Sequence, residues 1–262
     1  MLVALIDGQR IHAEEAQKGS TYHCPGCQEE VTLKKGTKVI HHFAHKPPVT
    51  CSWATGETKA HLQAKNLLMT HFKKLGYQAD VEYPINTQRA DVYVQGKHGA
   101  NIFEIQHQPI TPAEIARRTA AYFQAGAAVT WLSLIDIAKF KGRSKQTTNG
   151  YLVERYSPKP FERWLHGFNF KEIWFVDPST EMLWKGQFEP SLIDVPYSEW
   201  HVSGGGTESA GGYTKFSKRW KKLILSGPYP LDTIRFGRKK RVGSTVGNHV
   251  YPAGNRITMT IE

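Results

Sequence analysis

One stretch of the chain restricts its fold more than any other: between residues 57 and 135 the spacing of apolar residues changes from helical to strand-like and back. Residues 57–75 are good helix formers and stop at Gly76, which suits the left-handed end of a helix. Three runs with the alternation or the β-branched and aromatic content of strands follow, at residues 77–85, 89–95 and 101–108.

A second helix has a clear start signal. Thr111 can cap it, Pro112 suits its first turn and Glu114 completes a capping box, so we expect the helix to run to about residue 125. Residues 128–135 then read as a buried strand. The order helix, strand, strand, strand, helix, strand predicts an α+β fold in which helices cover the faces of a mixed sheet.

The second and third strands are predicted to form a hairpin, because residues 96–99 (Gly-Lys-His-Gly) suit a short antiparallel turn. In that register Asp91 stands opposite Glu104 and Arg89 stands opposite Gln106, all on one side of the sheet. The opposite side is predicted to carry the apolar residues Ala90, Val92, Val94, Phe103 and Ile105.

Two carboxylates directly across an antiparallel pair lie roughly 5 Å apart and repel each other unless a cation stands between them. Hard oxygen ligands at this spacing suit Mg²⁺ or Mn²⁺, and such an ion can activate water for attack on a phosphodiester. The alternative is an exposed strand face on which Asp91 and Glu104 are solvated and paired with Arg89 or Lys97.

The first helix brings further polar groups toward the same face. Its apolar stripe extends backward at helical spacing to Lys65 and His61, which then point toward the sheet that carries the two acids. Such residues are often packed or snorkelling side chains, and this reading stays open. Glu82, in the first strand, is a third carboxylate that can reach the site.

A metal site is also indicated near the N-terminus, where Cys24-x₂-Cys27 is followed by His42-x₂-His45. Two close pairs of soft or borderline ligands are what a tetrahedral Zn²⁺ site requires, and a closed set of four argues for a structural ion. His41 and Cys51 compete for a ligand place, so the cysteine pair is the firmer one. With only three cysteines, the chain cannot carry a disulfide framework.

Positive charge is concentrated at the C-terminal end. The formal net charge is +11, and residues 203–262 hold eleven lysines and arginines against three acids. A flexible Gly-rich connector is expected at residues 203–212 and a basic helix at residues 215–222. Such clusters suit phosphate contacts that weaken as salt rises, although a solvated tail is the alternative. The clustered residues are Lys215, Lys218, Arg219, Lys221, Lys222, Arg238, Lys239, Lys240 and Arg241.

The chain divides, on these patterns, into a zinc-binding unit at 1–54, a core at 55–140, an aromatic-rich extension at 141–202 and a linker with a basic tail at 203–262. The aromatic-rich extension carries no recognisable chemistry. No apolar run is long enough for a membrane span, and Asp7 and Arg10 interrupt the apolar start, which does not fit a signal peptide. We therefore expect a cytoplasmic protein with no membrane partner.

A family resemblance rests on several short motifs in a fixed order. They are Cys24-Pro25-Gly26-Cys27, His42-Phe43-Ala44-His45, His61 with Lys65, Arg89-Ala90-Asp91-Val92, Glu104-Ile105-Gln106, Arg118 with Tyr122, and Trp131. This succession resembles the competence CoiA-like family over roughly the first 135 residues.

The resemblance implies a restriction-endonuclease-like core of the PD-(D/E)xK type, in which Asp91 and Glu104 bind the catalytic metal ion. The third signature position, usually lysine, is Gln106, which cannot carry charge. We hypothesise that Lys65, with His61, restores the missing cation. Arg118 and Tyr122 lie one helical turn apart and either brace each other or contact the DNA backbone.

The implied function is a Mg²⁺- or Mn²⁺-dependent DNA endonuclease, or a protein that processes branched DNA, in the recombination of incoming DNA during bacterial competence. Its partners would be single-stranded or branched DNA, with recombination proteins. A non-catalytic DNA-binding adaptor is the main alternative, because Gln106 departs from the signature, and an RNA-directed nuclease is a third reading.

Overall fold

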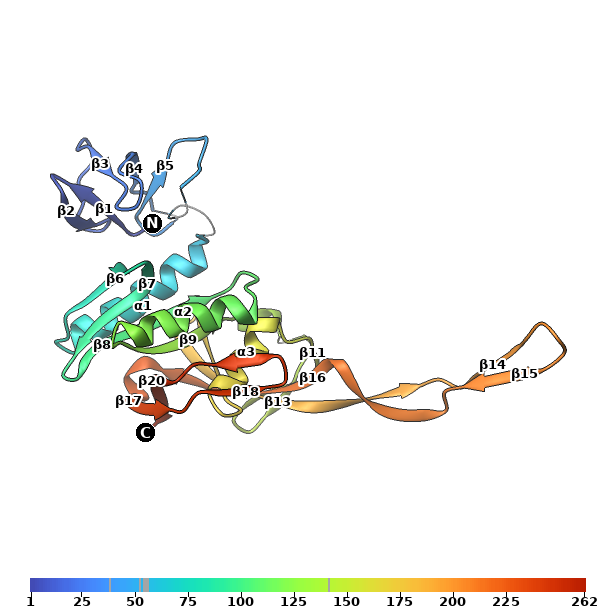
Figure 1. Cartoon of the computed structure of the whole chain (residues 1–262). Helices are drawn as coiled ribbons and strands as arrows, with labels where there is room; N and C mark the ends of the chain where they lie inside the picture. The colour runs from blue at the N-terminus through green and yellow to red at the C-terminus, as the bar shows by residue number, and fades with distance from the viewer. Residues whose placement is uncertain (38, 52, 54–56, 141) are drawn as a thin grey trace.

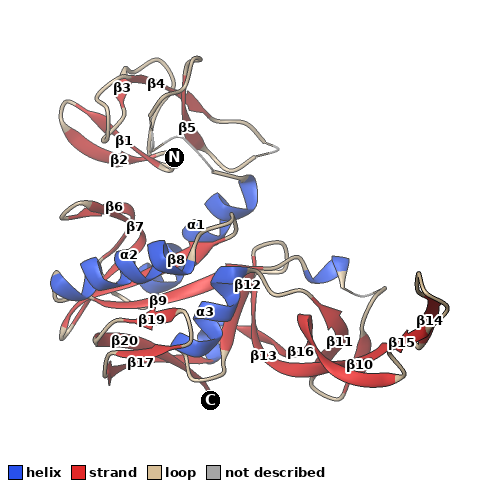
Figure 2. Ribbon diagram, turned by 45° about the vertical axis from the view of Figure 1, so that its right-hand side comes forward, coloured by secondary structure: helices blue, strands red, loops and turns tan. Residues whose placement is uncertain are grey.

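The computed structural model describes residues 1–262 except 38, 52, 54–56 and 141. An N-terminal unit with its own sheet lies above a larger body, and α1 (Lys59–Lys74) leads from one into the other (Figure 1). A long two-stranded projection leaves the body on the side away from the N-terminal unit (Figures 1 and 2). None of the helices in the described part of the chain combines the length and apolar composition needed to cross a bilayer.

The N-terminal unit is a five-stranded antiparallel sheet in the order β2-β1-β3-β4-β5. Its strands are β1 (Val3–Ile6), β2 (Gln9–His12), β3 (Tyr22–His23), β4 (Glu30–Lys34) and β5 (His42–His45). Its own apolar cluster holds few buried residues, and most are small: Met1, Ala4, Ala13, Ala16, Tyr22, Cys24, Val31 and Phe43. A core of this size contributes little to the folding stability of the unit by itself, and a bound metal ion can supply the rest.

The predicted order of helices and strands in the core is confirmed. It comprises α1, β6 (Ala79–Ile85), β7 (Gln88–Gly96), β8 (Gly99–Gln106), α2 (Pro112–Gln124) and β9 (Ala128–Leu134). Both helices begin as their sequences indicate, because the Thr58 side chain accepts the His61 N–H and the Thr111 side chain accepts the Glu114 N–H.

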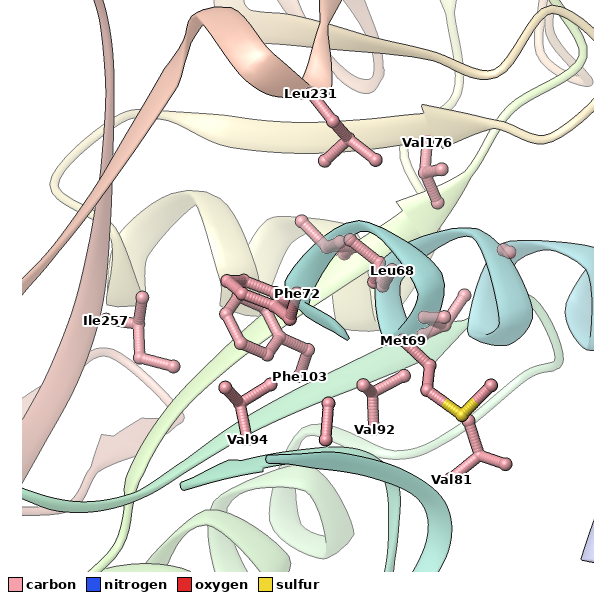
Figure 3. Packing of buried hydrophobic residues seen from close by; sticks show 14 of the residues in the cluster. Leu68, Met69, Phe72, Val81, Val92, Val94, Phe103, Val176, Leu231 and Ile257 are labelled. Carbon is pink, nitrogen blue, oxygen red and sulfur yellow. The ribbon is translucent and has the colours of Figure 1, made fainter. Parts of the chain in front are cut away.

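Two apolar layers cover the sheet. α1 packs Leu68 and Phe72 against Val92 and Phe103 of the central hairpin (Figure 3), whereas α2 packs on the other layer with Tyr122 and Trp131. Four of the five residues expected on one side of the hairpin, Val92, Val94, Phe103 and Ile105, lie in the α1 layer. The fifth, Ala90, lies in the α2 layer, so the alternation of β7 breaks between residues 90 and 92.

The C-terminal half extends the same sheet to eleven strands in the order β10-β11-β16-β13-β12-β9-β8-β7-β6, with β20 beside β9 and β17 beside β20. The helical elements here are α3 (Pro160–Phe168) and two single 3₁₀ turns, Ile137–Lys139 and Leu231–Thr233. The strands are β10 (Lys145–Thr147), β11 (Gly150–Tyr156), β12 (Ile173–Asp177), β13 (Met182–Val195), β14 (Ser198–His201), β15 (Thr207–Ala210), β16 (Tyr213–Pro230), β17 (Ile234–Arg241), β18 (Ser244–Val246), β19 (His249–Tyr251) and β20 (Gly254–Ile261).

Two expectations for the C-terminal half are wrong. The basic segment 215–222 is not a helix but part of the 18-residue strand β16, which pairs along β13, for example Ile193 with Lys215. Continuous cross-strand pairing overrides a helix propensity that is small per residue. The Gly-rich stretch 203–212 is not an open connector either, because it turns back from β14 into its partner strand β15.

The predicted domain boundaries lie at different kinds of position in the structure. Residues 54–55 lie outside the described part of the chain, as does residue 141. The boundary between residues 202 and 203 falls at the turn of the β14–β15 hairpin, so it separates no two units. Strands from both C-terminal segments join the core sheet, which makes residues 57–262 one continuous framework wherever they are described.

Candidate functional site

The centre of the candidate site is a buried lysine surrounded by carboxylates. Lys65, on α1, is 0 % exposed, and its Nζ lies 2.7 Å from Glu82 Oε1 and 2.9 Å from Glu57 Oε1. Asp91 Oδ1 stands 4.0 Å from the same nitrogen. Burial by itself lowers the pKa of Lys65, but the Glu82 and Glu57 carboxylates outweigh it and raise the pKa above its ordinary value. Lys65 is therefore a permanent internal cation.

Glu82 joins the N-terminal unit to this cluster. Its carboxylate accepts the backbone N–H of Leu2 at 3.0 Å and of Val3 at 3.3 Å, besides the ammonium of Lys65. Burial raises the pKa of Glu82, but Lys65 reverses the effect and the pKa falls to about 2. Every contact of this side chain is thus internal, and its backbone takes a left-handed φ of 53°, which non-glycine residues adopt at some cost.

His61 and Asp91 form the second part of the cluster. His61 Nε2 lies 3.1 Å from Asp91 Oδ2, and His61 Nδ1 lies 3.5 Å from Glu57 Oε2. Burial lowers the pKa of His61, yet the charge of Asp91 and its hydrogen bond raise it to about 9. The imidazole is therefore charged at neutral pH. Burial also opposes ionisation of Asp91, but His61 and Lys65 hold its pKa below the ordinary value.

The central hairpin opens at the acidic residues. Its observed register is the predicted one from Val92 opposite Phe103 to Gly96 opposite Gly99, and the ladder stops one position short of Asp91 and Glu104. Asp91 Oδ2 accepts the backbone N–H of Ile105 at 2.9 Å, so a side chain takes the place of a ladder bond. This break lets Asp91 turn toward α1.

Glu104 turns toward the other helix. Arg118 Nη2 lies 2.6 Å from its Oε2, and the Tyr122 hydroxyl donates to its Oε1. Asp91 and Glu104 therefore have their present partners on different helices, although the charge of Asp91 is close enough to raise the pKa of Glu104. Arg118 and Tyr122 also interact with each other through a side-chain hydrogen bond, in agreement with the bracing interpretation, and together they hold Glu104. The Arg118 guanidinium also lies 5.0 Å from the Trp131 ring.

The negative charge around Glu104 is only partly neutralised by Arg118. Burial raises its pKa, and although Arg118 opposes this effect, the nearby Asp91 charge adds to it, so the pKa reaches about 7. A fully buried carboxyl group that Arg118 only partly neutralises fits a place where a divalent cation adds positive charge. Asp91 and Glu104 are the two oxygen donors that fit such an ion.

Two neighbouring candidates have local partners. Arg89 donates to the Trp53 carbonyl at 2.8 Å, lies 3.5 Å from Glu57 and stacks 4.9 Å from the Trp53 ring, so it faces inward. The Gln106 side chain donates to the Gln108 carbonyl at 2.7 Å. Glu57 links Lys65, His61 and Arg89, and the sequence patterns had not singled it out as a site residue.

A separate group of metal-binding side chains lies in the N-terminal unit. Cys24, Cys27, His45 and Cys51 offer ligand atoms that all lie within 4.8 Å of one another. Cys27 Sγ is 3.3 Å from His45 Nε2, and Cys24 Sγ is 3.8 Å from Cys51 Sγ. Three sulfur donors and one imidazole are a set that suits a tetrahedral ion of borderline softness.

The fourth member is Cys51 and not His42, which corrects the expected ligand pair. His42 and His45 are three positions apart on the strand β5, and side chains at odd spacing point to opposite faces. His42 Nδ1 lies instead 2.9 Å from the Ile40 carbonyl oxygen, and His41 pairs with Glu14 at 2.7 Å. Gly26 is required at its place, because a Cβ there would meet the Trp53 ring at 2.4 Å.

The predicted phosphate-binding residues divide into two groups. Arg238 donates to the carbonyl of His98 in the β7–β8 turn, to two carbonyls at the start of β8 and to the Asn101 side chain. Arg241 is 5 % exposed among the rings of Phe168, Phe170 and Tyr251. These two stabilise the body. The exposed cations are Lys215, Lys218, Arg219, Lys239 and Lys240, while Lys221 and Lys222 are half-buried.

A small unit with a cysteine–histidine group that could hold a metal ion, followed by a helix-flanked sheet with buried acids and bases, places the chain among nuclease-like proteins. The comparisons with known families agree: competence protein CoiA, N-terminal domain, matches residues 6–54, and competence protein CoiA, nuclease-like domain, matches residues 57–181. The chain belongs to the competence protein CoiA family.

The competence protein CoiA of Bacillus subtilis (strain 168) is 30 % identical to this chain over 118 residues. The alignment covers 44 % of this chain and 32 % of that protein, so the chain matches about a third of its relative's length. No solved structure matches the chain. Residues 182–262 lie outside both family matches.

Proposed function

We propose that this protein is a metal-dependent DNA nuclease of the restriction-endonuclease-like type that processes single-stranded or branched DNA during bacterial competence. The observation that supports it best is the group of Asp91, Glu104, His61 and Lys65 at the point where the β7–β8 ladder opens. The family match to a nuclease-like domain supports this proposal, in which the protein acts on incoming DNA in the cytoplasm.

Asp91 and Glu104 would hold Mg²⁺ or Mn²⁺, which supplies an activated water and stabilises negative charge on the phosphate. For Glu104 to take part, its carboxylate has to exchange the guanidinium of Arg118 for the ion. Lys65 is too deeply buried to touch a phosphate in this arrangement, so it acts as a positioning residue that holds Asp91 ionised. His61 supplies the mobile positive charge and proton that Gln106 lacks.

The test is cleavage of linear, single-stranded and branched DNA by the purified full chain with Mn²⁺. We expect products with the unchanged protein and none with Asp91→Asn or Glu104→Gln. Glu114→Gln, which alters a half-buried carboxylate on α2 that pairs with Arg117, serves as the control. Cleavage that survives both active-site changes would contradict the assignment of these acids.

A second function, a non-catalytic DNA-binding adaptor that delivers DNA to recombination proteins, is favoured by one observation. Asp91 and Glu104 already have positive partners within the chain, namely His61 and Arg118. The same assay separates the two functions, because an adaptor retains DNA in a binding experiment and releases no products with Mn²⁺. RNA substrates in parallel test the remaining alternative, an RNA-directed nuclease.

The cysteine–histidine group is proposed to hold a structural Zn²⁺ ion. Cys24, Cys27, His45 and Cys51 complete a closed set without an open position, and closed sets stabilise a fold rather than catalyse. The Gly26 N–H donates to Cys24 Sγ at 3.3 Å and the Trp53 N–H to Cys51 Sγ at 3.4 Å, contacts that favour the thiolate form.

A further inference from the structure

The two-stranded projection in Figure 1, hereafter the arm, consists of residues 192–216. It is built from the end of β13, the β14–β15 hairpin and the start of β16. Its ten residues from 192 to 201 span roughly 33 Å at the usual rise of a strand. At its base the pairing of β13 with β16 is interrupted, and Arg163 donates to the Lys218 and Arg219 carbonyls. The arm is thus held firmly at one end and extends away from the rest of the chain.

The arm lacks the protection that a hairpin of this length needs. An isolated two-stranded ribbon is marginally stable in water, and its outer edges present unpaired backbone groups. It also exposes large apolar side chains on both faces: Leu192 60 %, Tyr197 61 %, Trp200 44 %, Tyr213 54 % and Phe216 66 %. Such a density of exposed aromatic residues is typical of a surface that another macromolecule covers.

The arm has a net negative charge, which does not favour DNA as its partner. Asp194, Glu199 and Glu208 stand against one cation, Lys215, although the whole chain has a net charge of +11. The acidic arm therefore repels a polyanion such as DNA. The basic body of a second copy of the chain attracts the arm. Trp200 faces Glu208 in the hairpin, with Glu199 next to it in the chain, so the indole is bordered by two carboxylates.

The body carries a pocket of complementary character between the β7–β8 hairpin and β17. Its volume is about 490 Å³, and its lining includes the partly exposed apolar residues Leu75, Tyr77 and Phe236. Lys97 and Arg238 contribute positive charge, and no carboxylate is among the described residues that line it. Arg238 is hydrogen-bonded to carbonyl groups, so no acid there neutralises it. An indole flanked by carboxylates matches this pocket in size, polarity and charge.

We propose that the arm of one copy docks on a second copy of this chain, with Trp200 in the partner's pocket and Glu199 and Glu208 facing Lys97 and Arg238. The contact is reciprocal in this proposal: each of two copies inserts its arm into the other, so the two contacts are related by a two-fold axis and close a dimer. This dimer rests on features outside the proposed catalytic site and does not depend on nuclease activity.

The experiment is sedimentation equilibrium of the full chain, unchanged and with single substitutions. We expect a dimer at micromolar concentration. Trp200→Ala should raise the dissociation constant by about thirtyfold or more, as removal of a central aromatic anchor does. Glu15→Lys, an exposed acid outside the arm, is the matched control for charge and should leave the dimer unchanged.

A charge exchange makes the test specific and independent of folding. Glu208→Lys and Lys97→Glu should each weaken the dimer by about tenfold or more, and the two together should restore it, because the contact is reversed and not removed. A monomer at every concentration up to 100 µM, or a dimer insensitive to Trp200→Ala, would overturn the proposal. So would a monomer whose affinity for DNA falls with Trp200→Ala, which would assign the arm to nucleic acid.

Discussion

Lys65 is the residue on which the candidate site depends most, because carboxylates surround its ammonium and no solvent screens them. Buried pairs of this kind contribute little net stability, since desolvation offsets attraction, but removing one partner leaves unpaired charge. Glu57 and Glu82 would both lose their main counter-charge in a chain without Lys65.

The first prediction follows from this arrangement. Lys65→Met should lower the free energy of unfolding by about 3–5 kcal/mol, because it leaves buried carboxylates without their cation. Urea denaturation measures the loss, and Lys74→Met on the exposed end of the same helix is the control, with a change within about 0.5 kcal/mol. Equal stability of the two variants would show that the cluster re-pairs without Lys65.

His61 predicts the pH dependence of stability. Its pKa is raised from 6.5 to about 9, so the folded state holds a proton that the unfolded state releases earlier. The contribution is fully present below pH 6.5 and is lost as the pH rises toward 9. A shift of this size corresponds to roughly 3 kcal/mol. Denaturation at several pH values should show this decline, and His61→Gln should flatten it; an unchanged slope would assign the decline to another group.

Membership of the site could be predicted from the sequence, but its contacts could not. His61 and Lys65 stand at helical spacing on one stripe, and a hairpin brings residues 91 and 104 to neighbouring positions. The split of Asp91 and Glu104 toward opposite helices depends on a break in the ladder that no local pattern indicates. Likewise, Glu82 meets Leu2 and Val3 across about eighty residues of sequence, beyond the reach of periodicity.

At the scale of single elements, β5 decides which residues can share a metal ion. A strand presents every second side chain to one face, so His45 can join the cysteines and His42 cannot. The spacing His-x₂-His suits a helix turn or a loop, and the sequence alone did not distinguish these from a strand. Cys51 was an alternative ligand on the basis of its residue type. The path of the chain after β5 brings it to the cluster.

The third prediction tests this assignment. Cys51→Ser should reduce bound zinc to well below one ion per chain and destabilise the N-terminal unit, because four ligands hold the ion and a hydroxyl is a poor replacement. His42→Ala should keep one ion, since its imidazole lies outside the group. Metal analysis of both purified variants measures the difference, and the reverse result would return His42 to the ligand set.

The basic strand β16 shows why element type was harder to predict near the C-terminus. Residues 215–222 are rich in lysine, which favours helices slightly, yet their partners on β13 lie 22 to 33 residues earlier in the chain, from Ile193 opposite Lys215 to Glu189 opposite Lys222. Where the apolar periodicity was long and local, as in α1 and α2, the expected element formed within two residues of its predicted bounds. In the C-terminal half, pairing between strands distant in sequence determined the element type.

For the whole molecule, the described residues form one connected framework. The N-terminal unit contacts the core through Glu82 and through Arg10, which lies 3.1 Å from Asp80, and the C-terminal strands extend the core sheet. Arg238 also connects β17 to the turn region of the central hairpin, β7–β8, through hydrogen bonds. Because these contacts fix the C-terminal half next to the candidate site, cations on it move with the site as one body.

The net charge of +11 gives the last prediction, which concerns only those cations that remain exposed. Lys218, Arg219, Lys239 and Lys240 face solvent, whereas Arg238 and Arg241 are committed to internal contacts. Each lysine or arginine that neutralises a phosphate releases counterions, so its loss lowers the slope of log affinity against log salt by about one. Replacing the four exposed residues with alanine should therefore weaken DNA binding and reduce this slope by up to about four.

Fluorescence anisotropy with labelled DNA at several salt concentrations measures this slope. The control removes the same charge elsewhere on the surface, at Lys18, Lys34, Lys73 and Lys74. If both quadruple variants lose affinity equally, the attraction comes from net charge alone and no particular surface binds DNA. If only the C-terminal variant loses affinity, the phosphates lie along β16 and β17. In that outcome the binding surface lies on the sheet that also carries Asp91 and Glu104, which agrees with both contacting one DNA molecule.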